Sequence, residues 1–478
     1  MLNQAAKPGE GYRRDLDGLR GIAVAAVVAY HLDLSFVPGG FVGVDIFFVL
    51  SGFLITRLIA AELRDGTFSI ARFYERRIRR IVPALVFVCA CTTAAAIAFL
   101  LPDELQRYAS SLMAAAFSYS NVWFFLHSGY FDPGSGAQPL LHTWSLGIEE
   151  QFYIVFPLLL MAVVRWWPRA LAPVVWLALA ASLAASIFFL PAHPMATFYL
   201  LHTRAWELLA GAIVALGLLP RPASRSQSEI AAALGLALIA VAIFAYTSKT
   251  PFPGAAALLP CIGTALAIWA GQGSSERGNA VAIGTRVLTF RPLILLGLIS
   301  YSLYLWHWPL IVFTKVMTSA RLEGPERIAL VVAAIILATA TWYFIEQPFR
   351  RRGASGFAPR AIFRAGTLGL GALAASAAIL ISLNGMPHRF PQAVLEIASA
   401  QADASPLREK CHFHGDGIRS YDDTCIIGDD VAPSVIVYGD SHGAEFSAAL
   451  GEFAKARHAS VRQITASGCP PASGFTFP

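Results

Sequence analysis

Long apolar runs separated by short polar segments fill the chain as far as residue 383. Most runs approach the roughly 20 residues that an α-helix needs to cross a bilayer. The pattern predicts eleven spans, at residues 16–36, 41–61, 81–101, 143–164, 171–190, 199–219, 230–246, 255–270, 293–316, 328–345 and 361–383. A further stretch, 110–126, holds several serines, and we expect it to lie at the membrane interface or to re-enter the membrane without crossing it.

Basic residues gather between alternate pairs of runs. These basic segments are 72–80, 165–169, 221–225, 286–291 and 350–352. Because cytoplasmic loops are enriched in Lys and Arg, we expect all five in the cytoplasm. They fall on one side only if residues 102–142 stay outside as a single segment. The N-terminus is then cytoplasmic, and the chain after residue 383 lies outside.

The composition excludes a soluble globular protein, because 56% of the residues are hydrophobic and only 14% are charged. The net charge of +6 is concentrated in the basic loops and therefore indicates topology. We expect an all-α polytopic membrane domain with membrane lipid as a partner and no nucleic-acid partner.

The first two spans carry Arg20, His31 and Asp45 within apolar runs, where ionisable side chains are costly and usually functional. Arg20 and His31 are eleven positions apart, almost three helical turns, so they share a face at a separation of about 16 Å. Asp45 follows the turn at residues 38–40 and is expected at the depth of His31, where a carboxylate would raise the basicity of the imidazole. The alternative is a buried structural histidine and a structural pair of Asp45 with Arg20.

The first basic segment contains an Arg-x-x-Arg pair in two registers. The pairs are Arg76 with Arg79 and Arg77 with Arg80. Arginines three apart on a helix face one way and can grip phosphate oxygens. The alternative is a topology anchor that binds lipid headgroups, which needs no defined spacing.

Two more groups of polar residues lie at span ends. Glu149 and Glu150 follow His142 at the outer end of the fourth span, where they could bind a hydroxylated substrate or assist proton transfer, or be ordinary flanking residues. His307 lies among aromatic residues in the ninth span, too deep for an interfacial aromatic belt. His142 and His307 are therefore candidate substrate-binding residues, and no metal site is predicted.

The tail has a different composition. Cys411 and Cys425 are predicted to form a loop-closing disulfide in an oxidising compartment, which leaves Cys469 without a visible partner. Residues 434–438 are typical of a buried strand that runs into Gly-Asp-Ser-His and a helical pattern, so Ser441 lies at a helix N-terminus. Such a unit opens a doubly wound α/β domain. Since 37 residues follow Ser441, we expect the chain to end within that domain.

Together these stretches resemble the bacterial membrane acyltransferase-3 family with a fused SGNH-hydrolase domain. The segments that carry the resemblance are LDGLRGIAVAAVVAYH, GGFVGVDIFFVLSGFLIT, RFYERRIRRIVPAL, HTWSLGIEEQFYIVFP, SYSLYLWHWPL, IEQPFR and GDSH. The resemblance implies a membrane domain at 1–350, a linking span at 351–385, a periplasmic extension at 386–430 and an incomplete SGNH domain at 431–478.

The resemblance also implies a function. The family transfers an acyl group, usually acetyl, from cytoplasmic acyl-CoA to a hydroxyl of an extracytoplasmic glycan such as O-antigen or a lipid-linked oligosaccharide, in the bacterial inner membrane. Arg20 and His31 match its Arg-x10-His motif. Ser441 matches the SGNH nucleophile, and Gly468 is the candidate for the oxyanion glycine of the second SGNH block.

These matches suggest a relay. The cytoplasmic arginines would hold acetyl-CoA, and His31, poised by Asp45, would accept the acyl group or activate an acceptor. Ser441 would then pass the group to a sugar. One alternative is a proton-coupled transporter or flippase of a glycan precursor, since intramembrane Arg, His and Asp also mark transport paths. Another is a membrane-tethered esterase in which Ser441 does all the chemistry.

Overall fold

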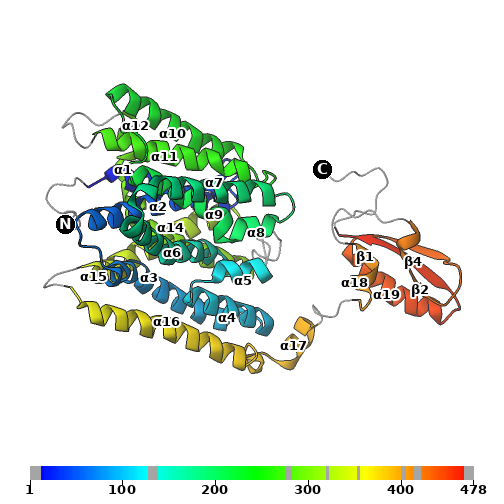
Figure 1. The fold of residues 1–478 in the computed structure, drawn as a ribbon. Helices are drawn as coiled ribbons and strands as arrows, with labels where there is room; N and C mark the ends of the chain where they lie inside the picture. The colour runs from blue at the N-terminus through cyan, green and yellow to red at the C-terminus, as the bar shows by residue number, and fades with distance from the viewer. Residues whose placement is uncertain are drawn as a thin grey trace. The chain divides into compact units, whose positions relative to one another are not determined.

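The structure is a computed structural model that describes residues 12–127, 138–274, 283–318, 322–351, 356–399, 405–413 and 421–467. The chain divides into two compact units, Met1–Met386 and Pro387–Pro478. The first is helical, and the second contains a small sheet (Figure 1).

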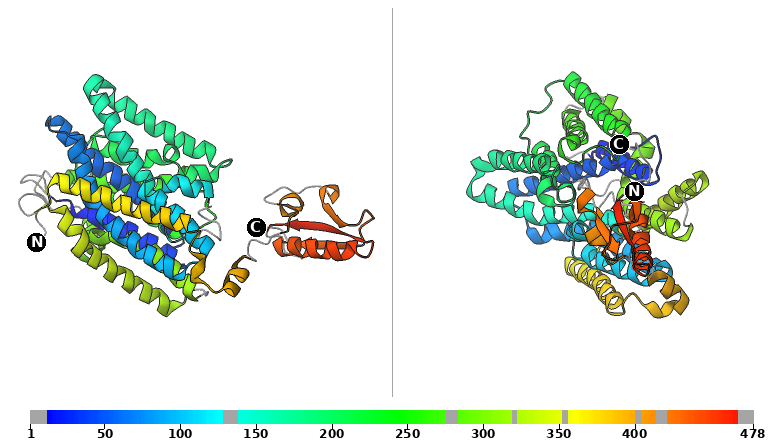
Figure 2. Two further views of the ribbon diagram at one scale, coloured as in Figure 1. Left: turned by 90° about the horizontal axis from the view of Figure 1, so that it is seen from below. Right: turned by 90° about the vertical axis from the view of Figure 1, so that its right-hand side faces the viewer.

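The helices of the first unit run largely side by side (Figures 1 and 2). In chain order they are α1 (Arg14–His31), α2 (Gly43–Arg64), α3 (Ile70–Phe99), α4 (Pro102–Ala116), α5 (Ser120–His127), α6 (Trp144–Trp166), α7 (Leu171–Phe189), α8 (Pro194–Tyr199), α9 (Leu201–Ala215), α10 (Arg225–Ala245), α11 (Leu258–Ser274), α12 (Ile283–Leu288), α13 (Arg291–Thr318), α14 (Gly324–Thr341), α15 (Gln347–Arg350) and α16 (Pro359–Ser382).

Nine helices among the described residues are long and apolar enough to cross a membrane, which supports a multi-pass membrane protein. They coincide with nine of the eleven predicted spans. The other two predicted spans correspond to α1 and α9, which have 18 and 15 residues and carry several charged side chains. The stretch 110–126 is divided between the short helices α4 and α5, neither of which is among the nine.

Two helix boundaries differ from the prediction. Helix α1 ends at His31 and not at residue 36, because the chain turns at Asp33, whose φ of 55° is left-handed. Helix α3 begins at Ile70, so the basic segment 72–80 is helical and not a loop. The hydroxyl of Ser69 caps this helix by accepting a hydrogen bond from the backbone N–H of Arg72.

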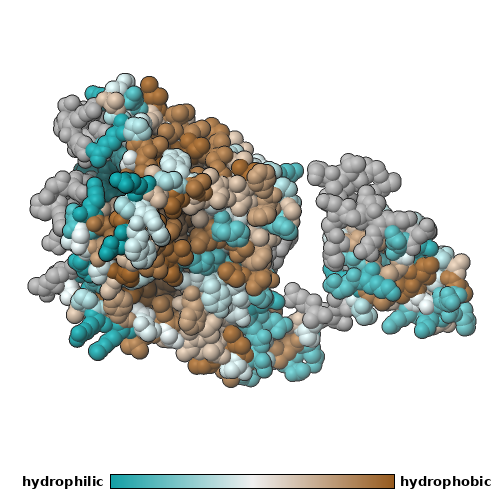
Figure 3. All heavy atoms as spheres, viewed as in Figure 1, coloured by the Kyte–Doolittle hydropathy of each residue, from teal (hydrophilic) through white to brown (hydrophobic). Residues whose placement is uncertain are grey.

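Apolar side chains cover much of the outer surface of the helical unit (Figure 3). Phe188 is 78% exposed, Leu368 is 73% exposed and Leu177 is 69% exposed. Exposure of so many large apolar side chains is unfavourable in water and is expected where lipid tails surround the helices.

Small residues bring the central helices close together. A Cβ atom at Gly297 of α13 would lie 1.9 Å from the carbonyl oxygen of Asp17 in α1, and one at Gly52 of α2 would lie 1.8 Å from that of Leu208 in α9. Only glycine allows such approaches, which are common between helices in membranes. Helix α13 is thereby held against α1, and α9 against α2.

The second unit has the α/β organisation that the sequence predicts. Its elements are α17 (Gln392–Ser399), α18 (Arg408–Cys411), β1 (His412–Phe413), β2 (Cys425–Gly428), β3 (Val435–Gly439), α19 (Ser441–Lys455) and β4 (Ser460–Ala466). Strand β4 pairs in parallel with β3 and β1 and antiparallel with β2. The β3–α19–β4 connection is thus the predicted βα unit followed by a parallel strand, and the predicted disulfide between Cys411 and Cys425 is confirmed.

Candidate active site

A cleft inside the helical unit collects polar residues that the sequence places in five separate segments. It contains about 790 Å³ of space that atoms do not occupy, part of it open to solvent. Its ionisable lining residues are Arg20 of α1, Arg77 and Arg80 of α3, and Glu149 and Glu150 of α6. The cleft therefore joins three guanidinium groups to two carboxyl groups.

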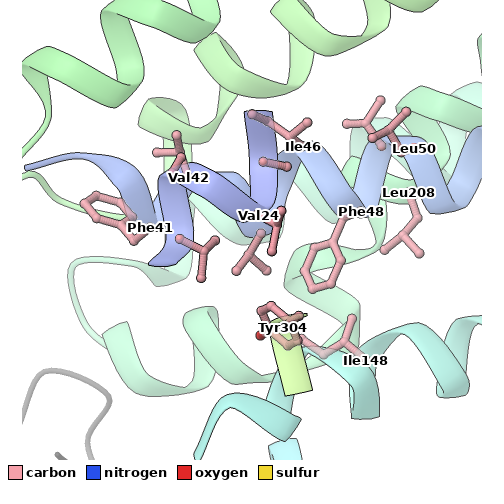
Figure 4. Close-up of a cluster of buried hydrophobic side chains, with 14 of the residues drawn as sticks. Val24, Phe41, Val42, Ile46, Phe48, Leu50, Ile148, Leu208 and Tyr304 are labelled. Carbon is pink, nitrogen blue, oxygen red and sulfur yellow. The ribbon is translucent and has the colours of Figure 1, made fainter. Parts of the chain in front are cut away.

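The apolar wall of the cleft comes largely from α2. Phe48 and Leu50 line it, and the ring of Phe48 lies above Tyr304 of α13 and Ile148 of α6 (Figure 4). Phe48 is fully buried, and Tyr304 is 6% exposed. Such a wall lowers the local polarity, so charges beside it interact more strongly than they would at a surface.

The cleft distinguishes the two arginine registers. Arg77 and Arg80 line it, and neither makes a hydrogen bond or an ion pair with any residue that the structure describes. The guanidinium of Arg77 lies 5.9 Å from the ring centroid of Phe73 and 5.8 Å from that of Tyr153. Aromatic faces hold a guanidinium without neutralising its charge. Arg77 and Arg80 are therefore available to an anion.

Arg76 and Arg79, which the sequence also offers for coenzyme binding, pair with other residues and do not line the cleft. Arg76 forms two hydrogen bonds with the carboxylate of Glu62, of 2.5 and 2.8 Å. Arg79 pairs with Glu75 at 2.7 Å and donates to the backbone carbonyl groups of Phe349, Arg351 and Phe357. The Arg79 side chain is buried and ties α3 to α15 and to the residues that follow it.

The two glutamates differ in their surroundings. The carboxylate of Glu149 accepts hydrogen bonds from the hydroxyl groups of Ser51, at 2.9 Å, and Tyr153, at 3.0 Å. Glu150 has no hydrogen-bond partner among the described residues and shares the cleft with Arg77. Glu149 is thus held in place, whereas Glu150 can change its protonation state without breaking a contact within the protein.

His31 is paired with His307, and the predicted pair with Asp45 is wrong. Nδ1 of His31 lies 3.0 Å from Nε2 of His307, and the two rings stack with centroids 5.2 Å apart. The ring of His142 lies 5.8 Å from that of His307. His142 and His307 are 3% and 1% exposed. Three histidines predicted separately therefore form one cluster.

Tyr304 connects the histidine cluster to the cleft. Its hydroxyl group lies 2.7 Å from Oγ of Ser145, and both residues line the cleft. The same hydroxyl donates to the backbone carbonyl of His142, at 2.9 Å. Arg20 lines the cleft and pairs with Asp17 at 3.5 Å, whereas His31, at the other end of α1, does not line it. The cleft thus ends one side chain away from the histidines.

Asp45 belongs to a separate buried cluster that sequence reasoning missed. Its carboxylate lies 3.1 Å from the guanidinium of Arg204 in α9, which also lies 3.1 Å from Glu207. The carboxyl groups of Asp45 and Glu207 and the thiol of Cys261 lie within 4.8 Å of one another, but Arg204 is already the cation among them. The signal in the sequence was an Arg and a Glu three positions apart inside an apolar run, the spacing of a helical ion pair.

We predict that Arg204 matters more for stability than Asp45 does. Arg204→Met leaves two carboxyl groups in a dry site without a cation, and removal of a buried partner typically costs about 3–5 kcal/mol. Asp45→Asn leaves the pair of Arg204 with Glu207 intact and should cost less. Thermal unfolding of the two variants in detergent measures this order, and equal melting temperatures would contradict it.

In the second unit, Ser441 is the first residue of α19, and Asp440 caps the helix. The Asp440 carboxylate accepts a 2.9 Å hydrogen bond from the backbone N–H of His442, and this bond holds the pKa of Asp440 below its usual value. Ser441 makes no hydrogen bond with a described residue, and the His442 side chain is 93% exposed. The candidate oxyanion residue Gly468 lies outside the described residues.

Comparison with known proteins identifies both units. The profile of the acyltransferase domain family matches residues 13–346, and that of the SGNH domain fused to such acyltransferases matches residues 410–478. No solved structure is a significant match.

The chain is also similar to curated bacterial proteins. It is 34% identical to peptidoglycan O-acetyltransferase OatA of Listeria monocytogenes over 358 residues, which are 72% of this chain and 56% of the relative. It is 33% identical over 366 residues to putative peptidoglycan O-acetyltransferase YrhL of Bacillus subtilis, with 73% and 56% covered. It is 30% identical over 364 residues to O-acetyltransferase OatA of Staphylococcus aureus, with 73% and 58% covered. The aligned part thus spans little more than half the length of these relatives. The chain belongs to the bacterial membrane acyltransferase family in which the acyltransferase domain is fused to an SGNH domain.

Proposed function

We propose that this protein transfers an acetyl group from acyl-CoA to a hydroxyl group of a cell-wall glycan. The observation that carries the proposal is the pair of cleft arginines, Arg77 and Arg80, which have no partner among the described residues. With Arg20 they bring three guanidinium groups to one cleft. Coenzyme A carries phosphate groups at one end and the thioester at the end of a long flexible arm, which suits a cleft that holds guanidinium groups and is connected to the histidines through Tyr304.

The chemistry that we infer begins at His31. A lone pair of its imidazole attacks the acyl carbon of the thioester, the carbon–sulfur bond breaks, and the electron pair leaves with sulfur as the thiolate of CoA. An acceptor hydroxyl then attacks the acyl-imidazole, an ester forms and the imidazole is regenerated. The proton of that hydroxyl is the one that finally neutralises the thiolate, so atoms and charge balance.

The carboxyl groups of the cleft provide a route for this proton. Glu150 lacks a hydrogen-bond partner among the described residues, and we infer that it delivers the proton to the thiolate. Ser441 is the first acceptor in a relay, or a sugar hydroxyl takes the acyl group directly. The similarity to two relatives named as peptidoglycan O-acetyltransferases favours peptidoglycan over O-antigen as the final acceptor.

Reconstitution of the purified protein in liposomes tests the proposal. Acetyl-CoA labelled in the acetyl group and soluble peptidoglycan fragments are supplied, and both free CoA thiol and labelled glycan are measured. We expect thioester cleavage that depends on the glycan, with one label transferred per thiol released. A transporter would instead accumulate glycan without releasing thiol, and that result would overturn the proposal.

A further inference from the structure

The residue His307 of α13 is placed to control the chemistry of His31. It lies 276 positions further along the chain, yet the two rings are nearly parallel, with an angle of 20° between their planes. His307 is 1% exposed, so no bulk water competes for its ring nitrogens. Each hydrogen bond that it makes therefore determines where its proton resides.

The hydrogen-bond partner of Nδ1 determines which ring nitrogen of His307 carries the hydrogen. Nδ1 of His307 lies 2.7 Å from the backbone carbonyl oxygen of Tyr304. A carbonyl oxygen can only accept, so Nδ1 of His307 must carry a hydrogen. In a neutral imidazole the opposite nitrogen, Nε2, is then the acceptor.

The hydrogen between the two rings consequently belongs to His31. Its Nδ1 donates to Nε2 of His307 across 3.0 Å. A neutral His31 with hydrogen on Nδ1 carries its reactive lone pair on Nε2, at the far side of the ring. The carbonyl of Tyr304 thus fixes the tautomer of His31 through a chain of two hydrogen bonds.

We propose that His307 is the positioning residue of the reaction, which orients His31 and selects the tautomer whose Nε2 attacks the acyl carbon. The inference rests on the proposed function and replaces Asp45, which pairs with Arg204, in this role. When Nε2 becomes acylated, the Nδ1–H bond to His307 strengthens, because the ring then carries positive charge. His307 therefore favours the intermediate over free His31.

Neighbouring contacts keep this pair rigid. The ring of Trp308 meets that of His31 edge-on with centroids 4.7 Å apart, and its Nε1 donates to the backbone carbonyl of Gln138 at 2.8 Å. Close approach of α13 and α1 at Gly297 fixes the distance between the helices that carry the two histidines. A hydrogen bond of defined length across this interface is thus maintained by the fold and not by the two side chains alone.

Two substitutions of His307 separate positioning from bulk. His307→Phe keeps a ring of similar size but offers no acceptor, and we expect kcat for thioester cleavage to fall about 10- to 100-fold while KM for acetyl-CoA changes less than about twofold. His307→Gln can place an amide oxygen near the position of Nε2, and we expect it to restore most of the lost rate. Trp306→Phe, which alters an aromatic side chain of the same helix that contacts Phe87 and Thr341, is the matched control and should remain near the wild-type rate.

Nitrogen NMR of protein labelled at histidine gives a readout that does not depend on activity. The His31 signals are identified by their disappearance in His31→Ala. We expect wild-type His31 to carry hydrogen on Nδ1, and His307→Phe to lose this preference. Wild-type kcat in His307→Phe, equal losses in His307→Phe and His307→Gln, or a hydrogen on Nε2 of neutral wild-type His31 would each overturn the inference. Absence of thioester cleavage in the wild type would instead refute the proposed function, and the NMR test would still stand.

Discussion

His31→Ala is expected to reduce acetyl transfer to below about one thousandth of the wild-type rate. A general base alone contributes about 10²- to 10⁴-fold, and loss of a covalent acceptor removes the pathway altogether. Binding of CoA should persist, because His31 does not line the cleft that holds Arg77 and Arg80. Transfer of labelled acetyl to glycan and binding of CoA, measured on the same preparation, check both statements.

The matched control is His202→Ala, which removes an exposed histidine of α9. It should transfer acetyl at the wild-type rate and unfold at the same temperature. If His31→Ala also retained the wild-type rate, the histidine cluster would be structural and the thioester would have to react elsewhere in the cleft. A variant that lost both transfer and CoA binding would point to a folding defect, which thermal unfolding would show.

Hydropathy predicted most of the helical unit because lipid imposes a simple requirement on length and polarity. Hydropathy was least accurate where charged residues interrupt the apolar runs. Helix α1 carries Asp15, Asp17 and Arg20 in its first half and ends at His31, five residues earlier than predicted. The basic segment before residue 81 looked like a loop, but a helix continues through it because arginine favours helices and Arg79 pairs with Glu75 one turn away.

Motif spacing selected the candidate site residues but did not predict which of them lie in contact. Periodicity reports the residues that share a face of one helix, as for Arg20 and His31. It contains no information on the contact of His31 with His307, 276 positions away, or of Asp45 with Arg204, 159 positions away. Equal depth in an antiparallel pair suggested Asp45 as the partner of His31. The side chain of Asp45 points instead to α9.

The two Arg-x-x-Arg registers show the same limit of sequence spacing, and the structure shows how their side chains differ. Both Arg-x-x-Arg pairs satisfy the helical spacing, so the sequence could not rank them. One register faces acidic and carbonyl partners, and the other faces the cleft. Arg77 and Arg80 form no ion pair with a described residue in a cleft whose wall is largely apolar, and unpaired charges are costly to bury. Binding of an anion would offset that cost, which is the property expected of a phosphate site.

The double variant Arg77→Ala with Arg80→Ala is therefore expected to weaken acetyl-CoA binding strongly. Each charge-assisted hydrogen bond contributes about 1.5–3 kcal/mol, so loss of two corresponds to roughly 100- to 10,000-fold in affinity. The loss of affinity should be largest at low ionic strength, because at high ionic strength salt already screens the charges of the wild-type arginines. Equilibrium binding of CoA at two salt concentrations, with dephospho-CoA as a second ligand, measures the effect and shows which phosphate the arginines contact.

Arg76→Ala, a substitution in the same helix, is the matched control. It removes the same charge one position away, together with a partly exposed pair to Glu62 that is worth about 1 kcal/mol or less. If the basic segment were only a topology anchor, Arg76→Ala and Arg77→Ala would weaken CoA binding equally or not at all. If the cleft is the coenzyme site, only Arg77→Ala does so, because charge alone attracts an anion but the direction of the side chain decides whether it is bound.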